Sequence, residues 1–472
     1  FSRMVLSSSS NTDHPNRKLN DSGGDAIRQP LLSTEEVEQN DVPPLNVLEE
    51  VPKTGFHIDV RKYRRQELAQ QLRQRRHEYS IVDNLHIGIY TFNVAGLEAP
   101  KPNEEDFLEQ ILGSNELPDI LVVSLQEVDM SALGIVMGNT QKGYSWVEAM
   151  HNTVRKVGPF AELMAEQLAG LMLFIYVKTV HQPNVRNMCA DVIKLGFLGG
   201  SLANKGALAG RFTLYARRFV FVGTHLNPHP EGNQDRIAQY KRSINELKFD
   251  LPPWADDELD MFHISESTDY IDDMNVPLNP TGSLIDPLTT DYCFWCGDLN
   301  FRLEMSREDV MKNIEMKNFP ALVAVDQLKI AQKEGMCFDV FQEGELSFPP
   351  TYRFDKGTVT YDTSPKQRSP AYTDRVLYMS PKPSENGDNP DGNVIIQTHY
   401  GFVDVRPSDH RPVCAHFQVR CQKSDPKMVA AVFSDTLDHF TEQLSDISLS
   451  TEGSAYCPVR SESGCGDVCK IM

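Results

Sequence analysis

Long hydrophobic runs are missing from this sequence of 472 residues. The longest apolar run, LAGLMLFIYV, is too short for a membrane-spanning helix, which needs about 20 apolar residues. Basic residues are also few, with 46 Lys and Arg against 66 Asp and Glu and a net charge of −20. This balance argues against a general nucleic-acid binder, because neutralising phosphates needs a basic face. A local basic pocket for a small polyanion stays compatible with it.

Cysteines at zinc-binding spacing are missing as well. The chain has nine cysteines, an odd number, and several of them (Cys293, Cys296 and Cys414) lie in apolar runs. Cys293 and Cys296 have no second cysteine pair or histidine pair at zinc spacing. The pattern predicts reduced core thiols in the cytosol and neither a zinc site nor a disulfide framework.

Composition divides the chain into four parts. Residues 1–55 are rich in Ser, Asn, Asp, Pro and Gly and are predicted to be disordered. Residues 56–82 predict a basic lead-in helix, which is either a solvated helix or a membrane-facing patch. Residues 83–421 hold the apolar runs of a folded domain, interrupted at 252–290 by a stretch predicted to be an acidic surface insertion. Residues 422–472 predict one amphipathic helix and a flexible tail.

Short apolar runs rich in Val, Ile, Phe and Tyr predict a series of strands in the folded domain. The predicted strands are 86–94, 119–127, 170–178, 206–215, 218–226, 291–298, 375–380, 394–398 and 413–419. Helical patterns occupy 105–112, 232–248, 306–316 and 320–333. Strands this numerous, with fewer helices between them, predict two packed sheets flanked by helices.

Polar residues recur where these predicted strands end. They are Asn93 in TFNVAG, Glu127 in SLQEV, His225 and Asn227 in VGTHLNPH, Asp298 and Asn300 in WCGDLNF, and Asp409 and His410 in VRPSDHRPV. A single residue of this kind usually serves a turn or a cap. Strand ends converge in space, however, so five such endings together predict a functional site.

Four of these residues suit a hard metal ion and a water molecule. Asn93 and Glu127 offer the oxygen ligands that Mg²⁺ accepts. Asp298 has the chemistry to orient or deprotonate an attacking water, and Asn300 to hold it without adding charge.

Three further residues suit phosphate chemistry. His410 is able to bond a phosphoryl oxygen, and Asp409 places a carboxylate next to it. Asp374, in SPAYTDRVLY, is a candidate to orient the His410 imidazole. Phosphoryl transfer to water needs little more than positioning, a metal ion and donors for the equatorial oxygens.

Two of these stretches also carry a resemblance to a known family. FWCGDLNFRL and RSPAYTDRVLY resemble the two signature motifs of the inositol polyphosphate 5-phosphatases, and the order TFNVAG, LQEV, SLANKGAL, THLNPH, SDHRPV is similar too. The resemblance covers roughly residues 84–420. It implies the α/β fold of the exonuclease–endonuclease–phosphatase superfold, a four-layer α/β/β/α sandwich of two mainly antiparallel sheets flanked by helices. It also implies Mg²⁺-dependent hydrolysis of the 5-phosphate of inositol phosphates or phosphoinositides.

The resemblance assigns roles residue by residue. It implies Asn93 and Glu127 at the metal, Asp298 and Asn300 with the attacking water, His225 and His410 at the scissile phosphate, and Asp374 behind His410. The implied substrate-binding residues are Asn204 and Lys205 in LANKG, Asn227, and Tyr352, Arg353, Lys366 and Arg368 beside a neighbouring 4-phosphate.

Several nearby residues have structural interpretations. Arg302 and Arg375 either pair with core carboxylates or serve the site, and the sequence leaves both possibilities open. Trp295 and Phe301 are predicted to pack in the core. His229 and His399 are interpreted as loop residues and are not included in the predicted site.

The last four residues, CKIM, match the C-a-a-X prenylation pattern at Cys469, with a terminal Met that favours farnesyl. One prenyl chain anchors only marginally, so a second signal is expected, either palmitoylated Cys465 or the basic helix. These features predict peripheral attachment to a cytoplasmic membrane surface. The preferred substrates are phosphatidylinositol 4,5-bisphosphate and 3,4,5-trisphosphate, followed by soluble inositol 1,4,5-trisphosphate and 1,3,4,5-tetrakisphosphate.

Three alternatives remain at this point. The enzyme acts on soluble inositol phosphates only, or it is another phosphodiesterase of the superfold, a nuclease or a sphingomyelinase. The third alternative is a scaffold that binds phosphoinositides while its tails recruit partners, and the intact set of polar residues argues against it. Protein partners of the tails are not indicated by the sequence.

Overall fold

The computed structural model describes most of the region predicted to be a folded domain. The described residues are 71–72, 74–101, 106–113, 116–131, 140–196, 205–215, 217–251, 283–379, 394–425, 427–436 and 438–439. Several predictions therefore lie outside the described residues: the disordered segment 1–55, the phosphate-loop residue Asn204, and the tail with Cys465 and Cys469.

The first sheet has the strand order β13–β14–β1–β2–β4–β3. Its strands are β1 Ser80–Asn93, β2 Ile120–Gln126, β3 Phe160–Leu168, β4 Leu171–Lys178, β13 Ile395–Phe402 and β14 Val413–Ser424. β1 and β2 run parallel, and the other neighbours are antiparallel. The carboxyl ends of β1 and β2 therefore meet at the same edge of the sheet.

The second sheet has the order β11–β12–β10–β7–β6–β5 and repeats this arrangement. Its strands are β5 Val185–Lys194, β6 Gly206–Leu214, β7 Arg217–His225, β10 Tyr292–Asp298, β11 Gln342–Glu343 and β12 Asp374–Met379. β7 and β10 are its parallel pair, and they bring His225 opposite Asp298. The prediction of two mainly antiparallel sheets is confirmed.

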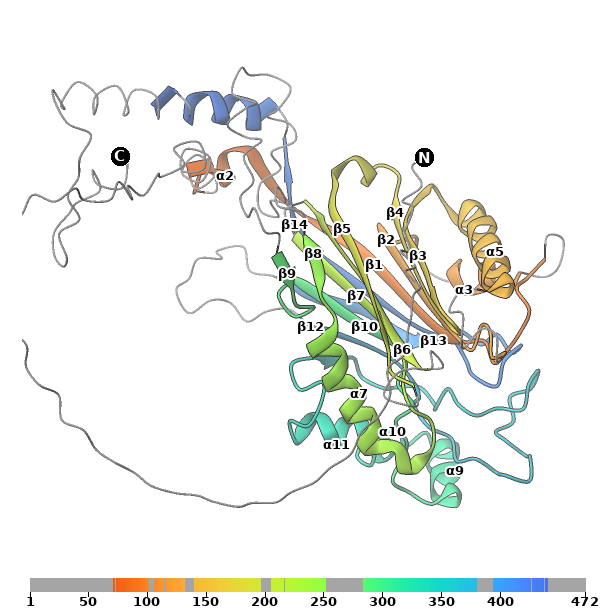
Figure 1. The fold of residues 1–472 in the computed structure, drawn as a ribbon. Helices are drawn as coiled ribbons and strands as arrows, with labels where there is room; N and C mark the ends of the chain where they lie inside the picture. Colours follow the sequence, from red (N-terminus) through yellow and green to blue (C-terminus); the bar gives the residue numbers. More distant parts are fainter. Residues whose placement is uncertain are drawn as a thin grey trace, which may run out of the picture. The chain divides into compact units, whose positions relative to one another are not determined.

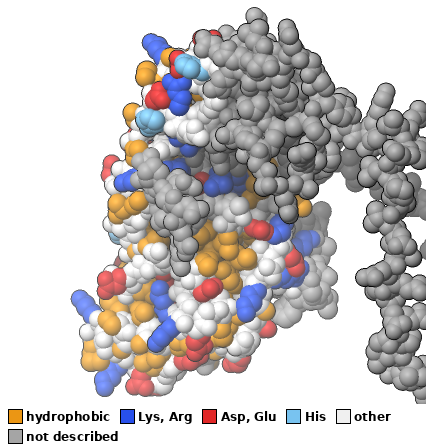
Figure 2. Space-filling view, turned by 90° about the vertical axis from the view of Figure 1, so that its left-hand side faces the viewer, with side chains coloured by type: hydrophobic (Ala, Val, Ile, Leu, Met, Phe, Trp, Pro, Cys, Tyr) orange, Lys and Arg blue, Asp and Glu red, His pale blue; other side chains and the backbone are white. Residues whose placement is uncertain are grey.

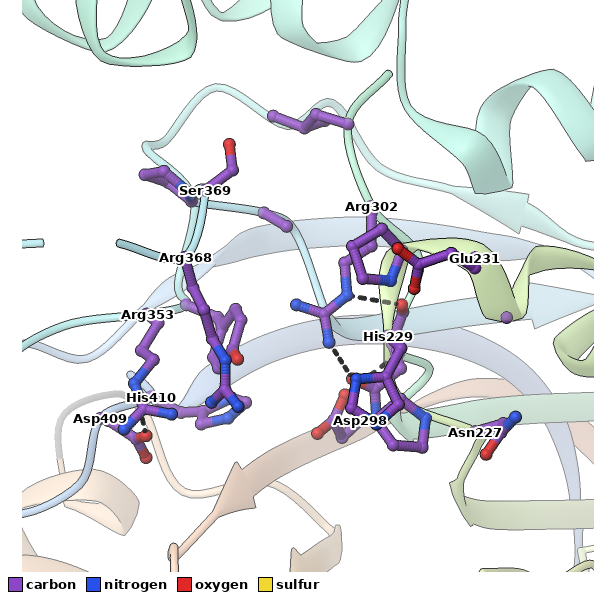
Figure 3. A pocket seen from close by; sticks show the side chains of 18 of the residues that line it. Asn227, His229, Glu231, Asp298, Arg302, Arg353, Arg368, Ser369, Asp409 and His410 are labelled. Carbon is purple, nitrogen blue, oxygen red and sulfur yellow. Dashed lines mark hydrogen bonds and ion pairs between the residues drawn. The ribbon is translucent and has the colours of Figure 1, made fainter. Parts of the chain in front are cut away.

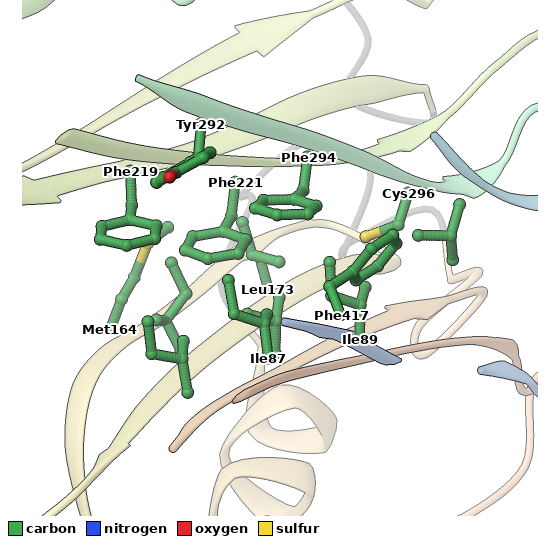
Figure 4. Close-up of a cluster of buried hydrophobic side chains, with 14 of the residues drawn as sticks. Ile87, Ile89, Met164, Leu173, Phe219, Phe221, Tyr292, Phe294, Cys296 and Phe417 are labelled. Carbon is green, nitrogen blue, oxygen red and sulfur yellow. The ribbon is translucent and has the colours of Figure 1, made fainter. Parts of the chain in front are cut away.

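The inner faces of the two sheets pack against each other through alternate residues of each strand. Phe294 on β10 packs between Phe221 on β7 and Phe417 on β14, with ring centroids 5.3 and 5.0 Å away. Figure 4 shows this stack of rings between the sheets, with Ile87 and Ile89 of β1 below it. Burying a side chain such as that of Phe294 contributes roughly 2–3 kcal/mol, so this layer supplies much of the stability.

Helices cover the two outer faces (Figure 1). The first sheet is covered by α3 Phe107–Leu112 and α5 Gln141–Val157, whose Trp146 is fully buried. The second sheet is covered by α7 Asn233–Glu246 and α11 Gln327–Lys333, whose residues share a core cluster with Trp295. The other described helices with bounds are α2 Arg76–Tyr79, α9 Arg307–Glu315 and α10 Phe319–Val323. The four-layer α/β/β/α sandwich is confirmed.

The predicted strands are all present. The prediction missed the helix α5, the edge strands β3 and β5, and the short strands at 249–251, 283–285 and 342–343, and the predicted helix 320–333 is divided into α10 and α11. The α5 helix had a readable signal, because Thr140 caps its N-terminus and Trp146, Met150 and Val154 recur every four residues on its buried face. The alternating but weakly apolar residues of β3 and β5 explain why these two edge strands were missed.

The boundaries of the predicted parts shift in two places. The predicted lead-in helix 56–82 is too long at its end, because residues 80–82 are strand and pair with residues 422–424 of β14. The predicted acidic insertion 252–290 is also too long at its end, because β9 Ser283–Ile285 lies within it and pairs with β8 Phe249–Leu251 in a small two-stranded sheet. Residues 252–282 of the insertion lie outside the described residues. Residues 427–436 are helical, in agreement with the predicted C-terminal helix.

The described surface shows charges of both signs. Figure 2 shows a face on which Lys and Arg side chains alternate with Asp and Glu side chains around hydrophobic ones. The net charge of −20 is therefore not gathered into one acidic field on this face. None of the described helices is long and apolar enough to cross a membrane.

Candidate active site

The four parallel strand ends meet at one edge of the sandwich. The side chains of Asn93, Glu127, His225 and Asp298 stand there, at the ends of β1, β2, β7 and β10. Asn93 Nδ2 donates to Asp298 Oδ2 at 2.9 Å and so joins the two sheets directly. The backbone amide of Ala95 donates to Asn93 Oδ1 at 2.9 Å and fixes the orientation of this carboxamide.

Gly297 explains how β10 delivers Asp298 to this edge. Its φ of 141° is a backbone conformation that side-chain-bearing residues rarely adopt. A Cβ atom at this position would lie 1.9 Å from the carbonyl oxygen of Thr224 on the neighbouring strand β7. The glycine in WCGDLNF therefore allows β7 and β10 to approach closely just before His225 and Asp298.

Asp298 is buried, with 2% of its surface exposed. Burial raises the pKa of its carboxyl to about 6, and the neighbouring Asp374 carboxylate adds to this rise. Asp298 Oδ1 accepts a hydrogen bond of 3.1 Å from the backbone amide of Asn300. A carboxylate with a pKa this close to neutrality is suited to accept a proton from water.

His410 and Asp374 form a buried pair beside Asp298. His410 Nδ1 lies 2.9 Å from Asp374 Oδ2, and this oxygen also accepts hydrogen bonds from the hydroxyls of Thr351 and Thr373. Burial opposes ionisation of the imidazole, but the Asp374 carboxylate outweighs it and raises the pKa of His410 to about 10. The pair therefore presents a positively charged imidazolium to the site at neutral pH.

His225 and Lys205 form a second pair on the other side of Asp298. Lys205 Nζ lies 2.5 Å from His225 Nε2, and this nitrogen is 3.5 Å from Asp298 Oδ2. Burial lowers the pKa of Lys205 to about 8. Burial, together with the charges of Lys205 and His410, holds the pKa of His225 well below its ordinary value, so this imidazole is neutral.

Asn300 and Arg302 complete the floor of the site. Asn300 Nδ2 donates to the Leu226 carbonyl at 3.1 Å, and its Oδ1 accepts from Arg302 Nη2 at 2.6 Å. The Arg302 guanidinium also stacks over the Tyr352 ring, 4.7 Å from its centroid. Arg302 thus pairs with a carboxamide in the site, which decides for this residue between the two possibilities that the sequence left open. Arg375 does pair with core carboxylates, those of Asp326 and Glu343.

The predicted 4-phosphate residues line one wall of the same pocket. Tyr352, Arg353, Lys366 and Arg368 all border it, although the last two lie far from Asp298 in the sequence. Figure 3 shows Arg353 and Arg368 on the same side of the pocket as His410. Arg353 Nε lies 3.3 Å from Asp409 Oδ2, so the Asp409 carboxylate holds this guanidinium in place. We call the wall formed by Arg353, Lys366 and Arg368 the basic wall.

The opposite wall is formed by residues 227–235, which follow β7. It includes Asn227, predicted from the sequence, and also His229 and Glu231, which were not. Figure 3 shows these three residues across the pocket from Arg368. The sequence signal for His229 was its place two residues after Asn227 in THLNPH, and it was interpreted as a loop residue. The whole pocket has a volume of about 980 Å³, large enough for an inositol phosphate.

The residues present fit a divalent metal ion. Within the described part of the chain, the half-buried Glu127 carboxylate accepts no hydrogen bond, and the neutral His225 imidazole has its Nε2 4.0 Å from Glu127 Oε1. Asn93 Oδ1 accepts one hydrogen bond and keeps a second lone pair. Among the described residues, Asp374 Oδ1 is buried without a hydrogen-bond partner, and the carboxylates of Asp298 and Asp374 lie close enough for their oxygens to be within 4.8 Å of one another. These oxygens are of the kind that Mg²⁺ and Ca²⁺ accept.

Residues 90–416 match the sequence profile of a known family, described as Endonuclease/Exonuclease/phosphatase family 2. The chain belongs to this family. Among its relatives is the mouse type II inositol 1,4,5-trisphosphate 5-phosphatase, 31% identical over 73% of this chain and 31% of that protein. Another is the phosphatidylinositol 4,5-bisphosphate 5-phosphatase INP51 of Saccharomyces cerevisiae, 29% identical over 80% of this chain and 36% of that protein.

The fold of this chain is similar to the crystal structure of the inositol polyphosphate 5-phosphatase domain of SPsynaptojanin. That crystal structure was solved with inositol (1,4)-bisphosphate and a calcium ion. The similarity has a TM-score of 0.61 at 26% sequence identity and covers 81% of this chain and 98% of that domain. The described domain therefore shares the fold of this inositol polyphosphate 5-phosphatase domain. The chain spans only 18% to 36% of the length of the curated relatives that it matches.

Proposed function

We propose that this chain hydrolyses the 5-phosphate of inositol phosphates that carry a neighbouring 4-phosphate. The observation that supports this most is the position of the basic wall directly beside Asp298 and His410 in one pocket. A polyanion bound there meets cations that the net charge of −20 does not reveal.

The side chains of the site have two roles in the proposed reaction, proton transfer and positioning of the phosphate. Water attacks phosphorus as the P–O bond to the inositol oxygen breaks, and Asp298, with a pKa of about 6, accepts the proton of that water. The leaving inositol oxygen takes up a proton from the solvent and departs as a hydroxyl. The His410 imidazolium and Lys205 donate to the phosphoryl oxygens on either side. The hydrogen bond from Arg302 Nη2 to Asn300 Oδ1 at the floor of the pocket fixes the orientation of both side chains, so their N–H groups keep a fixed direction.

The metal would be held by the carboxylate of Glu127 and the carboxamide oxygen of Asn93. A bound Mg²⁺ would supply Lewis-acid stabilisation of the charge on the phosphoryl oxygens. The calcium ion in the SPsynaptojanin domain supports a divalent cation, and the choice of Mg²⁺ is part of this proposal.

Both lipid and soluble substrates are supported by the relatives. The mouse relative is named for inositol 1,4,5-trisphosphate and the yeast relative for phosphatidylinositol 4,5-bisphosphate. The shared chemistry is a 4,5-bisphosphate on an inositol ring. We rank phosphatidylinositol 4,5-bisphosphate and 3,4,5-trisphosphate first, followed by the soluble tris- and tetrakisphosphates.

The test is phosphate release from matched soluble and short-chain lipid substrates, with and without Mg²⁺. Asp298→Asn keeps the shape of the carboxyl and removes its base, so we expect kcat to fall by about 10³-fold or more. Asp339→Asn, an exposed residue outside the pocket, is the matched control and keeps the activity of the unaltered chain. Metal-independent release, or an active Asp298→Asn enzyme, would contradict the mechanism. Hydrolysis of a phosphodiester in place of these monoesters would favour a nuclease or sphingomyelinase.

Attachment to a cytoplasmic membrane surface stays a prediction, because Cys469 lies outside the described residues. It rests on the C-a-a-X pattern at Cys469, with palmitoylated Cys465 or the basic helix as the expected second signal. Cys469→Ser should move the protein from the membrane to the soluble fraction of a cell lysate. Unchanged partitioning of this variant would remove the support for prenylation.

A further inference from the structure

The two walls of the pocket differ in charge. The basic wall carries the cations of Arg353, Lys366 and Arg368. The opposite wall, residues 227–235, carries two carboxylates that line the pocket, those of Glu231 and Asp235. Its lining residues include no Lys or Arg. We call this second wall the acidic wall.

The acidic wall is held firmly from beneath. Arg236 is completely buried, and its Nη1 donates to the carbonyl oxygens of Asn227 and His229 at 3.1 and 2.8 Å. Its Nη2 donates to Gln327 Oε1 at 2.6 Å, and its guanidinium lies over the ring of Phe301, 5.2 Å from the centroid. The charge of Arg236 is therefore used to hold the backbone of the wall and does not face the pocket.

The carboxylates of the wall are placed for hydrogen bonding. Asp235 Oδ2 accepts from Asn227 Nδ2 at 2.8 Å, which orients both side chains. Glu231 and Asp235 are both exposed to the pocket and to solvent. A carboxylate accepts hydrogen bonds only, so it suits a hydroxyl group and repels a phosphate.

The geometry of the inositol ring relates the opposite charges of the two walls to the substituents that the site accepts on carbons 4 and 6. Carbon 5, which carries the scissile phosphate, has two ring neighbours, carbons 4 and 6, on opposite sides. With the 5-phosphate at Asp298 and His410 and the 4-phosphate at the basic wall, the substituent on carbon 6 faces the acidic wall. A hydroxyl there donates to a carboxylate, whereas a phosphate there meets like charge.

We propose that Glu231 and Asp235 make this site selective for inositol rings with a free 6-hydroxyl and exclude rings that carry a 6-phosphate. The inference rests on the proposed 5-phosphatase function and adds a specificity to it. In this proposal the acidic wall recognises the substituent on carbon 6, whereas the basic wall binds the 4-phosphate and the metal and the attacking water act on the 5-phosphate.

The test compares 5-phosphate release from inositol 1,4,5-trisphosphate and inositol 1,4,5,6-tetrakisphosphate, which differ by the 6-phosphate alone. We expect kcat/KM of the unaltered enzyme to be about 100-fold lower for the tetrakisphosphate, because two carboxylates face the added phosphate and like charges repel. In the double variant Glu231→Gln with Asp235→Asn, this ratio should narrow by about tenfold, mainly because tetrakisphosphate hydrolysis rises. Glu334→Gln, an exposed glutamate outside the pocket, should leave the ratio unchanged.

The outcomes separate this inference from the proposed function. Equal kcat/KM for the two substrates, or a ratio that the double variant does not alter, overturns the role of the acidic wall while the 5-phosphatase function stands. Failure of the unaltered enzyme to release phosphate from either substrate overturns the proposed function and the inference with it. A ratio that narrows equally in Glu334→Gln shows a general effect of net charge and also overturns the inference.

Discussion

Replacing Asp374 by Asn removes one negative charge from the His410 pair and keeps nearly the same shape. Asp374 Oδ2 lies 2.9 Å from His410 Nδ1 in a fully buried environment. The pKa of His410 is raised from 6.5 to about 10, and each pKa unit is worth about 1.4 kcal/mol. The surroundings of His410 thus favour the imidazolium by about 5 kcal/mol in total, and Asp374 is the largest favourable contributor. Without it, burial dominates, and His410 should be neutral at pH 7.5.

Loss of the imidazolium should lower kcat/KM for inositol 1,4,5-trisphosphate by about 100-fold or more at pH 7.5, because the donor to the phosphoryl oxygen loses its charge. The free energy of unfolding should also fall. Since the folded pKa of His410 is raised, the pair stabilises the fold fully below pH 6.5, and this contribution is lost as the pH rises through about 10. The difference between the two proteins in urea denaturation should therefore be large at pH 6.5 and small at pH 10.5.

Asp291→Asn is the matched control for this substitution. Asp291 is also a buried carboxylate paired with a cation, Arg218, but it lies just before β10, seven residues ahead of Asp298. Its replacement should lower stability and leave kcat/KM unchanged. The reasoning is refuted if Asp374→Asn retains kcat/KM within about threefold of the unaltered enzyme, or if His410 titrates in NMR spectra at the same pH in both proteins.

Three further predictions follow from local geometry. Gly297→Ala should lower the free energy of unfolding in urea by about 3 kcal/mol or more and abolish activity, because its Cβ would meet a backbone oxygen. Gly357→Ala, also at positive φ but with open space around it, should cost only about 1 kcal/mol, and equal losses at the two positions would contradict the argument. The double variant Lys366→Gln with Arg368→Gln should lower kcat/KM by about 10- to 100-fold for substrates with a 4-phosphate and much less for an analogue without a 4-phosphate. Equal losses of kcat/KM for the two substrates would contradict the role of the basic wall in binding the 4-phosphate. Burial, together with neighbouring histidines, lowers the pKa of His416 to about 4. The contribution of His416 to the free energy of unfolding should therefore fall by about 1–3 kcal/mol as the pH drops from 6.5 to 4. The variant His416→Gln should lack this part of the pH dependence of stability.

The sequence alone determined the layers of the domain. Strand and helix periodicities are local, so the runs around Phe221, Phe294 and Phe417 predicted buried strands whichever partners they had. The predictions that Trp295 and Phe301 pack in the core are confirmed for the same reason. Edge strands such as β5 were missed because their partly exposed residues carry a weaker pattern.

The candidate site was predicted as a set of residues, and the tertiary structure decided how they pair. Asn93 and Asp298 are 205 positions apart, and their hydrogen bond exists only because two sheets pack face to face. Nothing in the local sequence distinguished Arg302, which pairs with Asn300, from Arg375, which pairs with core carboxylates.

The charge of each wall is likewise a property of the folded chain. Lys366 and Arg368 are distant in sequence from Glu231, yet all three border one pocket. Local sequence determines which side chains leave a strand end, because that depends on nearest neighbours along the chain. Which charges face each other across the pocket depends on contacts between distant segments, and only the packed structure determines those.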